Sequence, residues 1–144
     1  MTMWKLFQVP ATHIDAAWKD GACKLGEACK RAEAEITPDQ LKMLLSHGMR
    51  DLVGVVNTET GATGWAAVQF QTLPNIRVLY VYAIYAPGAA GPECFRLLAD
   101  YAKQGGASSI RGACDEVIEK LWTRRFKAKR LYSICEIDLK AGDV

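Results

Sequence analysis

The stretch YAPGAAGPECFRLL, residues 85–98, joins an apolar, strand-like run to an amphipathic, helix-like run. Glycine-rich turns at such junctions often bind phosphate, because bare backbone N–H groups and the positive end of the helix dipole face the gap. This turn contains no Lys, Arg, Ser or Thr. The sequence therefore predicts the backbone of an anion site that lacks a supporting side chain.

Upstream of this turn, the hydrophobic pattern predicts three antiparallel strands. DLVGVVN (residues 51–57) and WAAVQFQ (residues 65–71) flank TETGATG, whose Gly and Thr content suits a reversing turn. A second turn at residues 73–75 leads into IRVLYVYAIY (residues 76–85), which is nearly all apolar. Such a run predicts a central strand that is covered on both faces.

The N-terminal part of the chain predicts one strand and two helices. Residues 3–9 alternate loosely and stop at a proline, and apolar residues then recur at helical spacing from Ile14 to Cys29. The next helix carries signals at both ends: Thr37 and Gln40 form a capping box, and a glycine follows the last turn.

Downstream of the turn, the sequence predicts helix, strand, helix, strand. The first helix ends at paired glycines, SSIRGAC (residues 108–114) follows as a fifth strand, and Asp115 can cap a helix over residues 116–127. LYSICEIDL (residues 131–139) alternates well and predicts a sixth strand. The helix before it is expected to bury Val117, Ile118, Leu121 and Trp122.

Length and composition predict a single globular domain over residues 1–144. Half of the 144 residues are apolar, which excludes global disorder, and the net charge of +2 does not by itself indicate nucleic acid or membrane as a partner. No apolar run is long enough for a signal peptide or a membrane span, so we expect a cytoplasmic protein. The five cysteines include no CxxC pair, which favours reduced thiols and predicts no metal site.

A basic run lies near the C-terminus, where six of the eleven residues from 120 to 130 are Lys or Arg. This run fits a solvated helix end equally well as a surface for an anionic partner, such as a CoA phosphate or an acidic protein. Few aromatic residues are interleaved with it, so nucleic acid is not the expected partner.

The element order β-α-α-β-β-β-α-β-α-β resembles that of the GNAT family of acyl-CoA-dependent N-acetyltransferases. The resemblance is carried by residues 52–70, 80–110 and 118–139 and extends over residues 4–139. The MWKLFQVP opening is similar to that of small GNAT-like proteins of tailed bacteriophages and prophages. The resemblance implies an α/β fold with a mixed, mostly antiparallel six-stranded sheet and helices on both faces.

The resemblance also implies a place for acetyl-CoA. In the family, the fourth and fifth strands splay apart, the pantetheine pairs with the backbone of the fourth strand, and the pyrophosphate sits on the following turn. Carried over by position, the expected cofactor-binding residues are Ala83, Tyr85, Gly88, Ala89, Ala90 and Gly91.

Several departures from the family pattern predict weak or lost acetyl-CoA binding. The turn is short and lacks the usual Arg or Gln, Pro92 has no N–H, and the carboxylate of Glu93 would repel a phosphate. Leu121 stands where many members of the family have a Tyr that protonates the departing thiolate. The fourth strand also lacks the Glu that often serves the family as general base.

The remaining catalytic candidates are Tyr82, Tyr85 and Cys114. Alternation along the fourth strand places Tyr80 and Tyr82 on one face and Tyr85 on the other. Each candidate also has an ordinary structural role, because buried tyrosines find hydrogen-bond partners and a small thiol packs well.

Two functions therefore stay open. One is an N-acetyltransferase acting on an unknown amine, in which proximity and backbone polarisation of the carbonyl supply most of the catalysis. The other is an inactive GNAT-like protein that binds a protein partner or assembles into a homo-oligomer or a bacteriophage virion, which would place it in a host cytoplasm or a virion.

Overall fold

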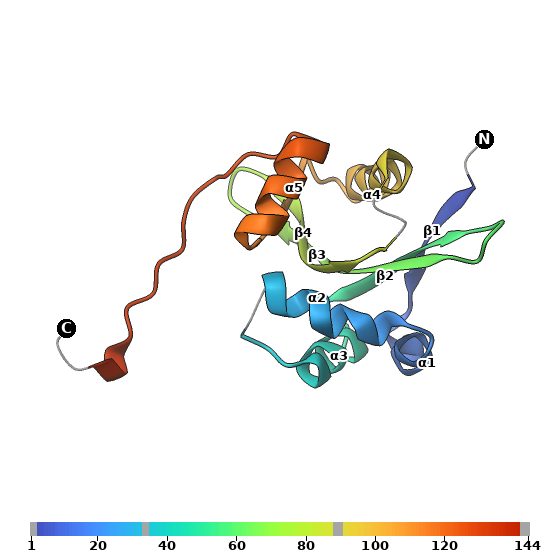
Figure 1. Ribbon diagram of the computed structural model, residues 1–144, viewed down its shortest axis with the longest axis horizontal. Coiled ribbons are helices and arrows are strands. Elements are labelled where there is room, and N and C mark those ends of the chain that lie inside the picture. The colour runs from blue at the N-terminus through green and yellow to red at the C-terminus, as the bar shows by residue number, and fades with distance from the viewer. Residues whose placement is uncertain (1–2, 33–34, 88–90, 142–144) are drawn as a thin grey trace.

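The computed structural model describes residues 3–32, 35–87 and 91–141, and its centre is a mixed five-stranded sheet with the strand order β1-β2-β3-β4-β5 (Figure 1). The first four strands pair antiparallel, and β5 pairs parallel to β4. The strands are β1 (Trp4–Val9), β2 (Asp51–Asn57), β3 (Thr63–Thr72), β4 (Arg77–Tyr85) and β5 (Ser109–Gly112). The helices are α1 (Ile14–Lys19), α2 (Leu25–Ala32), α3 (Pro38–Ser46), α4 (Pro92–Gln104) and α5 (Glu116–Phe126).

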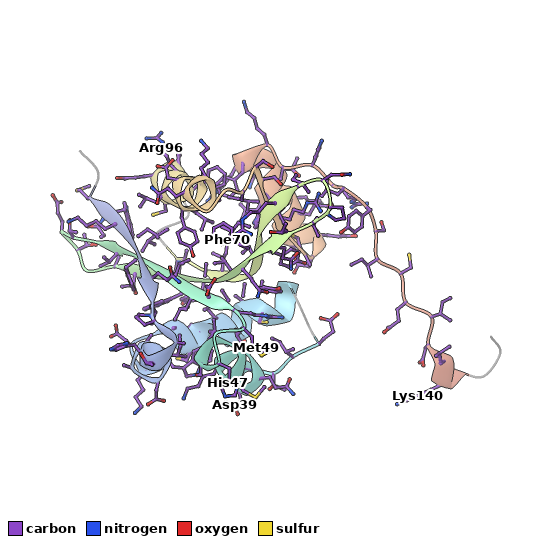
Figure 2. All side chains as sticks on the ribbon, turned by 180° about the vertical axis from the view of Figure 1, so that it is seen from behind. Asp39, His47, Met49, Phe70, Arg96 and Lys140 are labelled. Carbon is purple, nitrogen blue, oxygen red and sulfur yellow. The ribbon has the colours of Figure 1, made fainter. Side chains whose placement is uncertain are left out.

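Helices cover both faces of the sheet, as the sequence predicted. Figure 1 shows α1, α2 and α3 below the sheet and α4 above it. Ile14, Leu25 and Leu41 anchor the lower core against the sheet, and each is at most 1% exposed. Leu79 and Ala102 belong to the upper core between β4 and α4, where Phe70 packs from the sheet (Figure 2). No helix within the described ranges has the length and apolarity required to cross a bilayer.

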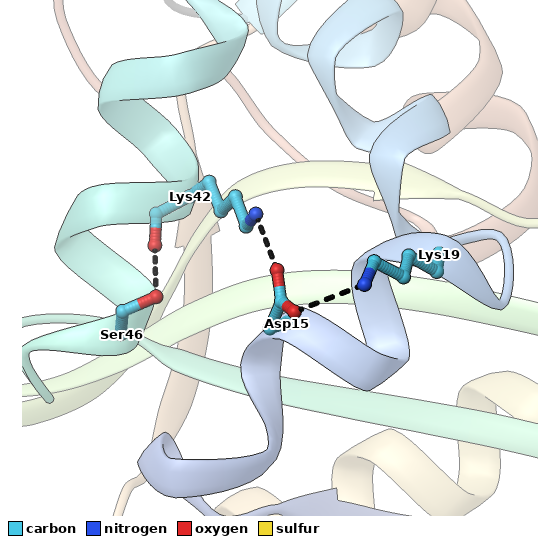
Figure 3. Close-up of polar contacts among 4 residues, drawn as sticks. All are labelled: Asp15, Lys19, Lys42 and Ser46. Atoms are coloured by element: carbon cyan, nitrogen blue, oxygen red, sulfur yellow. Dashed lines mark hydrogen bonds and ion pairs between the residues drawn. The ribbon is translucent and has the colours of Figure 1, made fainter.

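The capping box predicted for α3 is confirmed. The Gln40 N–H donates to Thr37 Oγ1 at 3.2 Å, and the Thr37 N–H donates to Gln40 Oε1 at 2.8 Å. An ion pair then ties α3 to α1, because Lys42 Nζ lies 2.7 Å from the carboxylate of Asp15, which also pairs with Lys19 at 3.3 Å (Figure 3). In the same view, Ser46 Oγ donates to the Lys42 carbonyl at 2.8 Å.

The single helix expected from Ile14 to Cys29 is broken into α1 and α2. Gly21 lies at the break with φ +128°, a conformation that L side chains rarely adopt. A Cβ at this position would lie 3.4 Å from the indole nitrogen of Trp65 in β3. The glycine therefore allows the chain to turn where it meets the sheet.

The prediction of a sixth strand over residues 131–139 is wrong. Residues 131–139 are not in a strand, and the sheet has five strands. Helix α5 ends at Lys127, which has φ 56°, and the chain then extends away from the sheet (Figure 1). Alternation specifies two faces of an extended segment, but a strand also requires a neighbouring edge with which to pair.

The expected buried face of α5 is also only partly correct. Val117 is 61% exposed, and no described residue of α5 is buried. Ile118, Leu121 and Trp122 are half-buried. These three residues belong to the part of α5 that packs on the body of the protein, and Trp122 packs against the upper core.

Candidate functional site

The strand β4 changes its pairing in the middle, at Tyr82. Val81 pairs with Val68 and Ala83 pairs with Ala67 on β3, so that Tyr82 has no partner in the register. This extra residue is a β-bulge, which bends a strand and increases its local twist. The bulge lies at the point where β4 and β5 separate.

Parallel pairing between β4 and β5 runs from Val78 opposite Ser109 to Val81 opposite Gly112 and then stops. Beyond it, β4 continues to Tyr85 while paired only with β3. Within the described part of the chain, no strand pairs with the other edge of this last stretch of β4. Its N–H and C=O groups on that edge therefore face the space that the separation opens.

That space is a cavity of about 840 Å³, a volume in the range of small-molecule sites. Its lining is mainly apolar and comes from both faces of the sheet, with Ala28 contributed by α2 and Leu98 by α4. The separation of the strands predicted from the GNAT resemblance is thus present. Five predicted site residues line this one cavity: Tyr82, Ala83, Tyr85, Gly91 and Cys114.

The bulge corrects the predicted orientation of the tyrosines. Regular alternation would place Tyr82 and Tyr85 on opposite faces. Instead, both pack against the core beneath α1, α2 and α3. One residue inserted between them reverses the alternation, so Tyr85 lies on the same face as Tyr82.

The hydroxyl of Tyr82 is engaged in a structural network. It donates to Gln69 Oε1 at 3.0 Å and accepts from Gln71 Nε2 at 3.2 Å. The guanidinium carbon of Arg50 lies 3.5 Å from the centroid of the Tyr82 ring. Gln71 is opposite Val78 in the sheet, so this hydroxyl points back along β4, away from the end where the strand separates. Tyr82 therefore has the ordinary role of a partly buried tyrosine.

Tyr85 also lines the cavity, at the end of β4. Its hydroxyl makes no hydrogen bond with any described residue. Lys24 Nζ lies 5.6 Å from the centroid of the Tyr85 ring, where the electron-rich face of the ring attracts the ammonium group. Tyr85 is the predicted catalytic candidate whose proton the protein leaves available.

Cys114 lines the cavity two residues beyond the end of β5, but its surroundings oppose an activated thiolate. Burial raises the pKa of the thiol, and the carboxylates of Glu119 and Asp115 raise this pKa further. The sulfur lies 3.9 Å from the Gly112 carbonyl oxygen, to which it donates weakly. Nucleophilic cysteines have lowered pKa values, so this site favours a packed thiol.

The N-terminus of α4 supplies the anion-binding end of the cavity. Gly91 is the N-cap, with φ −80° and ψ 171°, and no atom of a described residue beyond its chain neighbours lies within 4 Å of the position of a Cβ there. Phe95 N–H donates to the Gly91 carbonyl at 3.3 Å, whereas the N–H groups of Glu93 and Cys94 have no acceptor among the described residues. These two donors are available to an anion. The predicted residues Gly88, Ala89 and Ala90 lie outside the described residues.

The Glu93 carboxylate affects the pKa of the neighbouring Cys94 thiol at this helix end. Burial raises the pKa of the Cys94 thiol, and the Glu93 carboxylate raises it further. A helix N-terminus ordinarily lowers the pKa of a thiol. Burial is the larger cause of the raised pKa here, and the Glu93 carboxylate acts in the same direction.

A cation that the sequence did not assign to the turn comes from α5. The ring of Phe95 in α4 stacks on that of Phe126 at the end of α5, with centroids 4.3 Å apart and planes 14° from parallel. The stacking brings the last turn of α5 beside the first turn of α4, and Arg125 lines the cavity. The basic run indicated that an anion could bind α5, and Arg125 is the residue of this run's helical part that lines the cavity.

The sequence also gave no signal for Glu27. This residue of α2 is the one acidic side chain among the described residues that line the cavity. It lies in the first turn of α2, one of the helices below the sheet in Figure 1. A carboxylate in this mainly apolar cavity, which Lys103 and Arg125 also line, can attract a cationic amine and accept a proton from it.

Neither a protein-family model nor a curated protein matches the sequence. Solved structures do match the fold. A "possible acetyltransferase" from Clostridium difficile 630 has a TM-score of 0.62 at 11% identity, over 95% of this chain and 98% of that chain. A ribosomal-protein-alanine N-acetyltransferase from Brucella melitensis biovar Abortus 2308 has a TM-score of 0.62 at 16% identity, over 94% and 99%.

An aminoglycoside acetyltransferase from an uncultured soil metagenomic sample, solved in complex with sisomicin, has a TM-score of 0.61 at 10% identity, over 95% of this chain and 97% of that chain. At these identities the likeness concerns the fold. The chain therefore has the fold of acetyltransferases, as the GNAT resemblance predicted, with five strands in place of six.

Proposed function

We propose that this protein is an acyl-CoA-dependent N-acetyltransferase that transfers an acetyl group to an amine. The observation that carries the proposal is the separation of β4 from β5 at the Tyr82 bulge, which opens a cavity that reaches the N-terminus of α4. The fold that the chain shares with solved acetyltransferases supports it.

The residues that line the cavity fit acetyl-CoA in three respects. The free edge of β4 at Ala83 and Tyr85 offers backbone groups that can pair with the amides of a pantetheine chain as a strand would. The available N–H groups of Glu93 and Cys94 suit a phosphate, and Arg125 adds a positive charge. When bound, acetyl-CoA supplies a thioester-activated acetyl group.

Two residues are placed to manage protons in this cavity. We assign Glu27 to the acceptor side, where its carboxylate attracts the ammonium form of the amine and takes its proton. We assign Tyr85 as the acid, whose phenolic proton is available to the departing thiolate. The apolar lining excludes bulk water and strengthens both electrostatic effects.

Calorimetric titration of the purified chain with acetyl-CoA tests the binding part of the proposal. Micromolar affinity is expected, lost in Gly91→Glu and largely kept in Gly91→Gln, because only the first variant places a negative charge at the phosphate end. Gly91 has an ordinary φ and open space around its Cβ position, so both variants should fold. Dissociation weaker than millimolar in the unmodified chain would reject the enzyme.

Turnover requires a separate measurement. The chain should be mixed with acetyl-CoA and a panel of primary amines, and the loss of thioester absorbance and the mass of the acetylated amine should be followed. Reagents that detect free thiols are unsuitable, because Cys23 and Cys135 are exposed and would react. Acetylated product that is absent with Glu27→Gln supports the assigned acceptor side.

A non-catalytic role is the second candidate. It is favoured by Leu121, which lines the cavity where the family phenol is expected, and by the raised pKa of Cys114. Tight acetyl-CoA binding without turnover on any amine, or no binding at all, would support this role. The bacteriophage setting expected from the MWKLFQVP opening stays a prediction that belongs to this candidate.

A further inference from the structure

We propose that residues 131–139 form a strand that pairs with the free edge of β5 in a second copy of the chain, so that two copies exchange their C-terminal segments. The proposal does not depend on acyl transfer. The alternating sequence predicts a strand here, yet the segment extends away from the sheet, and Lys140 at its end lies far from the body of the protein (Figure 2). Ile134, Ile137 and Leu139 are 87%, 70% and 82% exposed.

The acceptor for such a strand is the outer edge of β5. This strand pairs with β4 on one side, and no strand among the described residues lies on its other side. Proteins ordinarily cover or blunt such edges, because unpaired backbone groups invite another strand. Ser109 Oγ on β5 is also buried without a hydrogen-bond partner among the described residues.

The surfaces beside β5 match the apolar face of the segment. Leu98 from α4 and Leu121 and Trp122 from α5 line the cavity together with Ser109 and Ile110 of β5. In an extended segment, alternate side chains share one face. The face made by the odd-numbered residues consists of Leu131, Ser133, Cys135, Ile137 and Leu139.

The charges are complementary as well. Glu136 and Asp138 make the segment acidic on its other face. On the acceptor side, Arg111 of β5 makes no hydrogen bond or ion pair with any described residue. A strand that carries two carboxylates is therefore attracted to this edge.

The segment follows α5 and extends away from the sheet (Figure 1). Arg130 forms two hydrogen bonds with the Glu119 carboxylate, at 2.6 and 2.8 Å, directly after the left-handed residue Lys127. As a strand, the nine residues that follow would span about 30 Å, enough to reach a neighbouring molecule. A two-fold exchange uses both segments and both β5 edges, so the assembly closes as a dimer.

The mass in solution and amide hydrogen exchange of the full chain test the proposal. Light scattering on a sizing column should give twice the 15.9 kDa chain mass, with slow exchange in residues 131–139. Ile137→Asp combined with Leu139→Asp should return the mass to one chain and abolish the slow exchange. These residues lie outside the sheet and its cores, so the body should fold, as circular dichroism can check.

Met43→Asp is the matched control, because it adds a charge at an exposed apolar residue on α3. This variant should remain a dimer. A loss of the dimer in Met43→Asp would assign the interface to α3 and overturn the exchange.

Cross-linking of copies labelled with light and heavy nitrogen separates exchange from folding back. The two are unfolded together, refolded and treated with a lysine cross-linker. Exchange predicts links between Lys140 and Lys103 that join one light and one heavy peptide. Links found only within one isotope would show that the segment pairs with its own β5, and would overturn the proposal. A monomer in the first experiment, or a dimer with fast exchange in residues 131–139, would overturn it too.

Discussion

The ring of Phe95 stacks on the ring of Phe126 with centroids 4.3 Å apart, and this contact joins the first turn of α4 to the last turn of α5. Trp122 meets Phe126 edge-on at 6.4 Å, so the stack continues toward the upper core. The positive end of the α4 dipole and the basic last turn of α5 are thereby held on one side of the cavity. Two weak anion-binding features are combined by an aromatic contact.

Replacing Phe126 with Ala should separate these features. Because the ring is half-buried and stacked, the free energy of unfolding should fall by about 1–3 kcal/mol, and acetyl-CoA affinity should fall several-fold. Urea unfolding and calorimetry measure the two effects. Phe126→Tyr, which keeps the ring, should stay close to the unmodified chain in both. An alanine variant with unchanged affinity would show that α5 does not help to hold the anion.

The two cavity tyrosines should respond differently to loss of the hydroxyl. Tyr82→Phe removes hydrogen bonds to Gln69 and Gln71, so it should lower the free energy of unfolding by about 1 kcal/mol and leave kcat nearly unchanged. Tyr85→Phe removes a hydroxyl without a described partner, so stability should hold while kcat falls by about 100-fold if Tyr85 is the acid. Equal kcat values for the two variants would reject the assignment of Tyr85.

The N-cap of α5 offers a third prediction. The carboxylate of Asp115 accepts from the Ile118 N–H at 2.8 Å. Asp115→Ala should therefore lower the free energy of unfolding by about 1 kcal/mol, whereas Asp115→Asn should keep most of it because Asn also caps well. Urea unfolding of the three proteins measures the difference. Equal losses in both variants would mean that charge, and not the cap, matters at this position.

The caps were predictable because their signals lie within a few residues of one another. Thr37 with Gln40, Asp115 before α5, and the Gly- and Thr-rich turn after β2 all behaved as the sequence indicated. The bulge at Tyr82 was not predictable, since β4 is almost uniformly apolar and hides a break in alternation. The orientation of Tyr85 and the opening of the cavity both depend on that one residue.

The strand predicted for residues 131–139 is absent for a different physical reason. The alternation of this segment gives an extended chain two different faces, but strand pairing also requires the edge of a distant strand, which no local pattern specifies. The sequence gave no signal for Glu27, and the basic run that includes Arg125 did not indicate this cavity, because both residues reach the cavity through the tertiary placement of their helices. Short sequence patterns thus predicted most helices and strands, whereas the lining of the cavity depends on how those helices and strands pack together.

Asp51 at the start of β2 predicts a pH dependence of stability. Burial raises the pKa of its carboxyl above the ordinary 3.8, so the folded protein binds this proton more tightly than the unfolded chain. Its ionisation therefore costs stability as the pH rises from about 3.8 through the raised value. Asp51→Asn should be more stable than the unmodified chain at neutral pH, and the gain should vanish in acid.

Asp15 is the control of opposite sign. Hydrogen bonds from Lys42 and Lys19 hold the pKa of its carboxyl below the ordinary value, so its contribution is present at neutral pH and lost as the pH falls through the lowered value. Asp15→Asn should therefore be less stable than the unmodified chain at neutral pH. Thermal unfolding at several pH values from acid to neutral compares the two variants. A gain of stability in both variants at neutral pH would contradict the lowered pKa of Asp15.

Glu93 provides the sharpest test of the anion site. Its carboxylate lies in the first turn of α4, where it stabilises the helix but repels a phosphate bound to the N–H groups of Glu93 and Cys94. Glu93→Gln should bind acetyl-CoA several-fold more tightly, with a gain that shrinks at high salt because the repulsion is screened. The pKa of Cys94 should fall in the same variant, since the Glu93 charge raises it. Glu59→Gln, in the exposed turn after β2, should leave both quantities unchanged. If Glu93→Gln lowers the Cys94 pKa without changing affinity, the phosphates bind elsewhere.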